Sequence, residues 1–471
     1  MKRDGKTSIH SSKSLFPDWA PEKGSAIRTN PRSVRPSPYS AGIWKQVTAV
    51  EEELINFRRE LHANPELAYK ETKTSKKMAE RFRKLGLEVK EGLAVTGLTA
   101  LLKGAKPGPT VAVLAAMDGV PVKEKNQVPY ASKKKLKIGN KEVWMSHAAG
   151  RDVELSVAYG VAEMLSKHRA VMPGAVKFII QPASEGPTKR EERGAPAMIA
   201  HGVLEQPNVE TLFSVVVQPK LRIGLVGMPE ERWWEGMTHF RINIAGSGLD
   251  NCLRPQSAGC IDPILTASQL VVSLQTQLPR HVESKEGIRL TVGSIKGGSK
   301  HGRLPQSVSV NGTIRWKRRS DANSAVAFIR RTVKGTQVTS RADMRVTFSE
   351  EKQMAQSNPE LIRWIIPTAR RVLGPRGIIF GGPAPVADHF AVFRRRIPSA
   401  LIQLGTHSSK LGTRRRLRTP NFNVDEECIS VGVHFLSNVV LDYLLEHKGP
   451  EKPEDTREEN PEQNPERNPD Y

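Results

Sequence analysis

The stretch "TVAVLAAMDGVPV", residues 110–122, decides the fold class. It holds an unbroken apolar run from Val111 to Met117, without the polar alternation of a strand that has one face in water. Such runs are typical of strands buried on both faces of a parallel sheet. The stretches "LTALLKG" (98–104) and "GAVKFIIQPASEG" (174–186) are also apolar. We therefore predict an α/β protein with a mixed, mostly parallel sheet.

Helical patterns flank these strands. Residues 47–86 contain two amphipathic patterns, which are separated by "NPE" and end at Gly86, a residue typical of helix C-termini. Residues 152–167 predict another helix, and a long final helix is expected near 429–446. We expect these helices to flank the sheet, as in other α/β domains.

A different pattern occupies residues 235–351. Its order of strand, helix, strand, strand, helix and strand is that of a ferredoxin-like α+β unit. The strands are predicted at 235–248, 288–298, 307–316 and 344–351, and the helices at 262–278 and 322–335.

The chain is therefore expected to form two domains and two disordered ends. The main domain comprises residues 46–228 and 346–448, and the inserted ferredoxin-like lid or dimerisation domain comprises 229–345. We expect disorder in the basic arm, residues 1–45, and in the tail, residues 449–471, which repeats an acidic-Asn-Pro theme.

The charge balance points to anionic partners. The chain has 72 Lys and Arg against 49 Asp and Glu, a formal net charge of +23. A surplus of this size attracts polyanions such as nucleic acid or an acidic protein, although a merely solvated basic surface explains it equally well. The basic residues cluster in "ASKKKLK" (131–137), "RWKRRS" (315–320), "VFRRRIP" (392–398) and "GTRRRLRTP" (412–420), and no known nucleic-acid-binding motif accompanies them.

Compartment is only weakly indicated. We see no secretory signal and no apolar run near the length that crosses a bilayer, so we expect no transmembrane segment. Cys252, Cys260 and Cys428 are too few and too scattered for a disulfide framework, which fits a reducing compartment. The location is expected to be intracellular, with the matrix of a plastid or mitochondrion as one candidate.

Several strings, in a consistent order from about residue 50 to 445, resemble one enzyme family. They include "FRRELHANPELAYKET" (57–72), "AAMDGVPV" (115–122), "QPASEG" (181–186) and "VNGTIRW" (310–316). The chain resembles the metal-dependent amidohydrolases that include auxin-conjugate hydrolases, hippurate hydrolase and N-acyl-amino-acid amidohydrolases. The resemblance implies two divalent metals, Zn or Mn in an active enzyme, bridged by a water that a carboxylate base activates.

The residues that this chemistry requires are largely replaced. The family loop His-Ala-Cys-Gly-His-Asp reads "HAAGRD" here, which places Ala149 and Arg151 at two ligand positions. In "QPASEG" the general-base position holds Ser184, and the neighbouring ligand Glu185 is kept. The other two ligand histidines are replaced by Val216 and Arg418, and two substrate-contacting positions of the inserted domain correspond to Asp250 and Gly302.

These replacements argue against metal binding. Ala and Val offer no ligand atom, and a guanidinium stays protonated, donates only and repels a cation. Arg151 and Arg418 are expected to pair with Glu185 in place of the metals. Such a cluster, with His147 beside it, admits two readings of equal weight: a structural ion pair, or a site for an anionic ligand.

Other candidate residues have less specific signals. His147 with Asp118, Asp152 and Glu185 would make a relocated single-metal site, but a hydrogen-bonded core histidine explains His147 better. Ser184 lacks the surroundings of a nucleophilic serine. His389 is expected on a helix surface.

The leading hypothesis is a catalytically inactive amidohydrolase-like protein that acts as a binding or structural component, with no cofactor. Two alternatives stay open: an amidohydrolase that releases amino acids from N-acyl or auxin conjugates through a rebuilt metal site, and a sensor of an anionic small molecule. The resemblance also makes a homodimer plausible, through the helix at 262–278.

Overall fold

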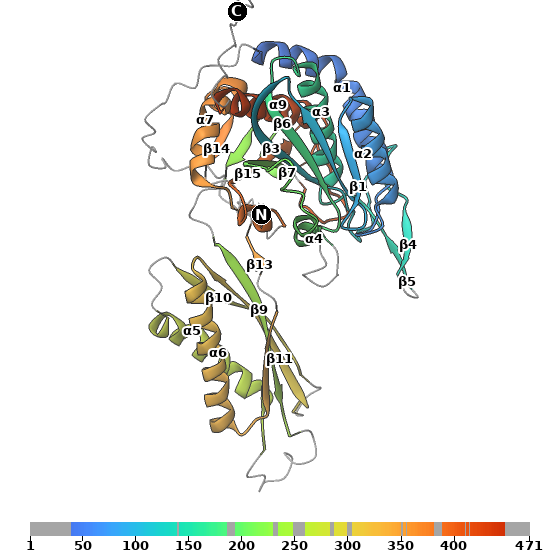
Figure 1. Ribbon diagram of the computed structural model, residues 1–471. Helices are drawn as coiled ribbons and strands as arrows, with labels where there is room; N and C mark the ends of the chain where they lie inside the picture. The colour runs from blue at the N-terminus through green and yellow to red at the C-terminus, as the bar shows by residue number, and fades with distance from the viewer. Residues whose placement is uncertain are drawn as a thin grey trace, which may run out of the picture. The chain divides into compact units, whose positions relative to one another are not determined.

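The computed structural model describes most of the chain between its two ends (Figure 1). The described residues are 39–138, 141–185, 194–228, 234–247, 260–282, 287–298, 304–349, 352–354, 356–380, 389–409, 411–413 and 415–447. The predicted tail, and the predicted arm up to residue 38, lie outside them.

An eight-stranded sheet carries the larger part of the fold, in the order β1-β2-β6-β3-β7-β15-β8-β14. Its strands are β1 (Glu88–Leu93), β2 (Gly97–Lys103), β3 (Lys106–Ala116), β6 (Pro173–Gln181), β7 (Thr211–Arg222), β8 (Val226–Met228), β14 (Ile378–Phe380) and β15 (Ser399–His407). The four central strands, β6, β3, β7 and β15, are parallel to one another. On one side β2 pairs antiparallel with β6, and on the other β8 pairs antiparallel with β15. The predicted fold class is confirmed.

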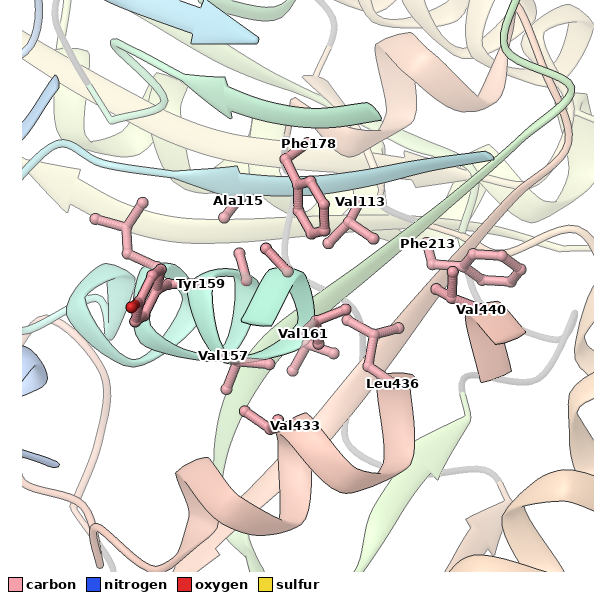
Figure 2. Close-up of a cluster of buried hydrophobic side chains, with 14 of the residues drawn as sticks. Val113, Ala115, Val157, Tyr159, Val161, Phe178, Phe213, Val433, Leu436 and Val440 are labelled. Carbon is pink, nitrogen blue, oxygen red and sulfur yellow. The ribbon is translucent and has the colours of Figure 1, made fainter. Parts of the chain in front are cut away.

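Helices cover both faces of this sheet. They are α1 (Ser40–Ala63), α2 (Thr72–Lys84), α3 (Arg151–Lys167), α4 (Gly194–Ala200), α7 (Pro359–Leu373), α8 (Phe390–Arg394) and α9 (Cys428–Glu446). Alternate residues of β3 explain the two faces: Val113 and Ala115 pack with α3 and α9, whereas Ala112 and Leu114 pack with α4 and α8. Figure 2 shows the first of these clusters, with Phe178 between β3 and α3.

Helix α9 is long and apolar enough to cross a membrane, which the expectation of no such run overlooked. Within the described part of the chain it is the one helix that meets this test, and 78% of its apolar window is buried. Its residues Val433, Leu436 and Val440 pack into the core in Figure 2. This burial assigns α9 to the core.

The second sheet is smaller and antiparallel. It has the order β10-β11-β9-β12, and β13 also pairs with β9. Its strands are β9 (Gly236–Ala245), β10 (Ile288–Lys296), β11 (Ser307–Trp316), β12 (Met344–Phe348) and β13 (Lys352–Gln353), and its helices are α5 (Pro263–His281) and α6 (Arg319–Ser340). Asp262 caps α5 by accepting hydrogen bonds from the backbone of Ile264 and Leu265, with Pro263 at the first helical position. The separate two-stranded sheet β4 (Lys135–Ile138) and β5 (Lys141–Trp144) is a hairpin.

Three boundaries or features differ from those expected. Helix α1 begins at Ser40, so residues 40–45 are helical and do not belong to a disordered arm. The boundary placed at 345/346 would cut β12, and β13 also pairs with β9, so the smaller sheet continues to Gln353. Cys260 is disulfide-bonded, which the spacing of the cysteines did not suggest, whereas Cys428 is a buried free thiol.

Candidate functional site

The candidate site lies where parallel strands end. Asp118 follows β3, Ser184 and Glu185 follow β6, and Arg418 lies in the segment between β15 and α9. Parallel neighbours place their carboxyl ends at the same edge of a sheet, which is where α/β proteins bind ligands. Arg151 joins them as the first residue of α3.

Two arginines converge on Glu185. Arg151 donates from Nη2 to Oε1 of Glu185 at 3.2 Å, and Arg418 donates from Nε to Oε2 at 3.0 Å and from Nη2 to Oε1. Arg151 also donates from Nη1 to both carboxylate oxygens of Glu154, at 2.8 and 3.0 Å. We call Glu154, Arg151, Glu185 and Arg418 the Glu185 ion-pair chain. Acidic and basic side chains alternate along it. Each carboxylate oxygen of Glu185 accepts a hydrogen bond from a guanidinium.

The backbone fixes the two arginines. Gly150, just before α3, has φ 82°, and a Cβ there would lie 2.2 Å from Cγ2 of Val217, so only glycine fits. Arg418 itself has φ 58°, in the left-handed region, and its N–H donates to the carbonyl of Ala148 at 2.7 Å. Solvent reaches them unequally: the side chain of Arg151 is 6% exposed and that of Arg418 is 40% exposed.

Asp118 holds the β6 segment in place. Its Oδ1 accepts from the Ser184 hydroxyl at 2.5 Å and its Oδ2 accepts from the Glu185 N–H at 2.6 Å. Burial raises the pKa of the fully enclosed Asp118 carboxyl, against the opposing charge of Arg151. Ser184 is therefore a hydrogen-bond donor to a supporting carboxylate, and it cannot replace the carboxylate base of the related enzymes.

Glu71 supports the same segment and was not singled out from the sequence. It accepts from the Ala183 N–H at 2.9 Å and from the Thr96 hydroxyl at 2.7 Å. Burial, reinforced by the charge of Asp118, raises the pKa of Glu71 to about 7 despite these hydrogen bonds. Its place in "AYKET", next to the start of α2, was the available signal.

His147 does not behave as expected. It is fully buried, as expected of a core histidine, but neither ring nitrogen has the expected hydrogen-bond partner among the described residues. Burial lowers the pKa of His147 to about 4, which keeps the ring neutral at physiological pH. No described contact joins it to the Glu185 ion-pair chain.

The remaining predicted positions are apolar or lie elsewhere. Ala149 is buried in the main core, and Val216 lies within β7, packed against the smaller apolar cluster. Asp250 and Gly302 lie outside the described residues. His389 is partly exposed at the N-terminal end of α8, and its Nδ1 lies 2.9 Å from Nε2 of Gln181, at the end of β6.

A second buried network, which the sequence did not reveal, lies behind the site. Asp152 is fully buried and pairs with Arg58 Nε at 2.6 Å and with His62 Nδ1 at 2.8 Å. His62 Nε2 in turn lies 3.0 Å from Glu124 Oε1, and Arg58 Nη1 donates to Glu426. The available signal was the i, i+4 spacing of two ionisable residues, Arg58 and His62, on α1.

The charge states of this network follow from its contacts. Burial would raise the pKa of Asp152, but the charges of Arg58 and His62 outweigh it and hold that pKa below its usual range. Burial and Arg58 both lower the pKa of His62, yet its bonds to Asp152 and Glu124 raise it overall. The carboxylates of Asp152 and Glu124, one near each ring nitrogen, favour the protonated form of His62, whereas the nearby Arg58 opposes it. Asp152 thus serves the packing of α1 on α3.

A metal centre does not fit these residues. Glu185 is the one ligand carboxylate kept at the implied positions, and both its oxygens accept from guanidiniums. No group of three or more His, Cys, Asp or Glu side chains within the described ranges is placed to hold a metal ion. A cation entering beside Arg151 and Arg418 would meet two fixed positive charges.

Comparison with known proteins identifies the family. The model of peptidase family M20/M25/M40 matches residues 112–442. The chain belongs to this family. It is 26% identical over 389 residues to an N-acetylcysteine deacetylase of Bacillus subtilis, which covers 82% of this chain and 96% of the relative. It is 28% identical over 406 residues to IAA-amino acid hydrolase ILR1-like 5 of Arabidopsis thaliana, covering 85% and 89%.

A solved structure of the M20 family agrees with the fold. A dinuclear metal-binding M20 peptidase from Bacillus subtilis superposes with a TM-score of 0.68 and 25% identity, covering 84% of this chain and 99% of that one. M20 relatives are thus amidohydrolases and peptidases, and this neighbour binds two metals.

Proposed function

We propose that this chain is an M20 family member that does not hydrolyse amides and works as a binding or structural component. The observation that carries the proposal is the pair of guanidiniums on Glu185, the residue that the family resemblance implies as a metal ligand. The family's chemistry requires a metal-bound water. The guanidiniums of Arg151 and Arg418 have no lone pair to ligate a metal, and they already occupy both carboxylate oxygens of Glu185.

The energetics favour this ion-pair chain over a metal. The side chain of Arg151 is 6% exposed and pairs with both Glu154 and Glu185, so a metal that displaced it from Glu185 would deprive a buried cation of a carboxylate partner. Removing one partner of a buried pair costs about 3–5 kcal/mol. A dication would have to overcome this cost with few protein ligands to hold it. Even if it bound, Ser184 would not supply a general base.

A second role rests on one further observation. The Arg418 side chain is 40% exposed, so it can turn from Glu185 toward a carboxylate or phosphate in solvent. The same site would then act as a sensor of an anionic small molecule. A rise in melting temperature with N-acyl-amino acids, absent in Arg418→Gln, is the expected signature.

Metal content tests the main proposal. We expect the purified protein, dialysed against trace zinc and manganese, to carry well below one metal per chain by mass spectrometry. A variant with Ala149→Cys, Arg151→His and Arg418→His restores ligand types at three positions and should bind zinc, and adding Glu185→Gln should weaken that binding.

Two results would overturn the proposal. One is near-stoichiometric metal in the unmodified chain, and the other is release of amino acid from N-acetyl or indole-acetyl conjugates that a chelator abolishes. Either result would support the rebuilt-site amidohydrolase.

A further inference from the structure

The smaller sheet has one covered face and one open face. Figure 1 shows α5 and α6 together on one side of β9, β10 and β11, and the buried residues of these strands, such as Ile242 and Val310, pack with those helices. The alternate residues of the same strands are partly or fully exposed. Described residues provide no cover for this second side, which we call the open face.

The open face forms polar rows across the strands. One row contains Ser294, Asn311, Arg241 and Thr347, which are direct partners in the strand register. Arg241 Nε donates to Asn311 Oδ1 at 2.9 Å, and Asn311 Nδ2 donates to Ser294 Oγ at 3.2 Å. The first bond joins the guanidinium of Arg241 to this row through its Nε, and no described residue hydrogen-bonds its two Nη groups.

The face is strongly cationic. The bounded strands β9, β10, β11 and β12 contain no Asp or Glu. By strand alternation, the open face carries five permanent cations: Lys296, Arg241, Arg289, Arg315 and Arg345. None of them forms an ion pair with a described residue. Two described acids just outside the strands follow the same alternation, Glu235 before β9 and Asp343 before β12.

The centre of the face is hollowed. A groove of about 480 Å³ is lined by polar side chains that include His239, Arg241, Asn311 and Thr313. His239 Nδ1 lies 2.8 Å from the Thr313 hydroxyl. Neighbouring strands lie about 4.8 Å apart and same-face residues about 6.8 Å apart, so cations and hydrogen-bonding groups form a regular grid.

We propose that the open face binds a single-stranded nucleic acid, with its phosphates on the arginine and lysine side chains and its bases over the central groove. Five cations within the strands, against two carboxylates at the strand ends, suit a phosphodiester chain, and hydroxyl and amide groups suit base edges and sugars. A lipid surface is a poorer match, because the face presents few apolar side chains to insert. A regular duplex has its bases paired and cannot offer them to a flat sheet.

This proposal rests on residues of the smaller sheet and goes beyond the proposed function. The metal content of the Glu185 site and binding at the open face are measured separately, so either can fail alone.

Salt-dependent binding tests it with the full chain and a fluorescein-labelled 20-nucleotide oligouridylate. Contact of all five cations with phosphates predicts a loss of about 100-fold in affinity between 50 and 200 mM salt, measured by anisotropy. In the variant Arg241→Gln with Arg345→Gln, we expect weaker binding and a loss of only about 20-fold over the same range. Its melting temperature should be unchanged, because both side chains are exposed.

The matched control is Arg280→Gln with Lys334→Gln. It removes the same charge from exposed positions on α5 and α6, and should bind like the unmodified chain. Equal weakening in both double variants would overturn the proposal, since it would indicate a diffuse basic surface. Tighter binding to a duplex, to phosphatidylserine vesicles or to a polyglutamate peptide than to the oligouridylate would overturn it too.

Discussion

At the residue scale, the partners of Glu185 differ in how much solvent they see. Arg151 is held between Glu154 and Glu185 in a nearly closed environment, whereas Arg418 reaches the same carboxylate from a 40% exposed position. A buried guanidinium depends on its partners, while an exposed one exchanges them for water at little cost. The two bonds to Glu185 should therefore contribute unequally to stability.

Glu185→Gln tests this inequality. Loss of the carboxylate charge removes one of the acidic partners of the buried Arg151, so we expect the free energy of unfolding to fall by about 1–3 kcal/mol in urea titrations at neutral pH. Arg418→Gln is the control and should cost below about 1 kcal/mol. Similar losses in the two variants would contradict the picture of one buried and one exposed partner.

At the scale of elements, α1 is joined to α3 through charge as well as apolar packing. Arg58 is fully buried, and its guanidinium lies against Asp152 of α3 and Glu426 just before α9. Its neighbour Arg59 shares Glu426 but has a side chain 43% exposed. Arg58 and Arg59 thus share Glu426 as a partner, but the first side chain is buried and the second is exposed.

Arg58→Ala should therefore be far more damaging than Arg59→Ala. The first leaves Asp152 buried beside His62 alone, and we expect a loss of about 3–5 kcal/mol in the free energy of unfolding. The second removes an exposed pair and should cost about 1 kcal/mol or less. Thermal and urea unfolding followed by circular dichroism measure both, and a comparable loss in Arg59→Ala would refute a central role for the Arg58–Asp152 pair.

At the scale of the whole molecule, stability should depend on pH through Glu71. The raised pKa of Glu71, about 7, means that the folded state binds this proton more tightly than the unfolded chain. Its contribution is fully present below the unfolded pKa, near 4.5, and is lost as pH rises through about 7.

Comparison of the chain with Glu71→Gln isolates this effect. We expect the unmodified chain to lose about 2–4 kcal/mol more than the variant between pH 4.5 and 8, at about 1.4 kcal/mol for each unit of pKa difference. His62 also has a raised pKa and loses its contribution as pH rises, but it does so in both proteins. Parallel stability curves would show that Glu71 is not protonated in the folded state at mild pH.

Much of the architecture was predictable because burial leaves a periodic trace in the sequence. The unbroken run around Val113 indicated a strand covered on both faces, and α4 and α8 do cover the face opposite α3. The ferredoxin-like order was also readable. The expected boundary at 345/346 falls inside β12, because β12 pairs with β9 across about a hundred residues and periodicity does not reveal such pairing.

The sequence by itself determined which chemical groups stand at the positions that the resemblance implies as metal ligands, since Ala149, Arg151 and Arg418 are given by the residues alone. Only the tertiary structure decided how those groups are paired. Two examples are the ion pair of Arg151 with Glu154 and the ring of His147, which has no hydrogen-bond partner among the described residues. Both depend on distances between side chains that periodicity does not encode. Residue type fixes the charge and donor atoms of a group, whereas its partner is chosen by packing among segments far apart in the chain.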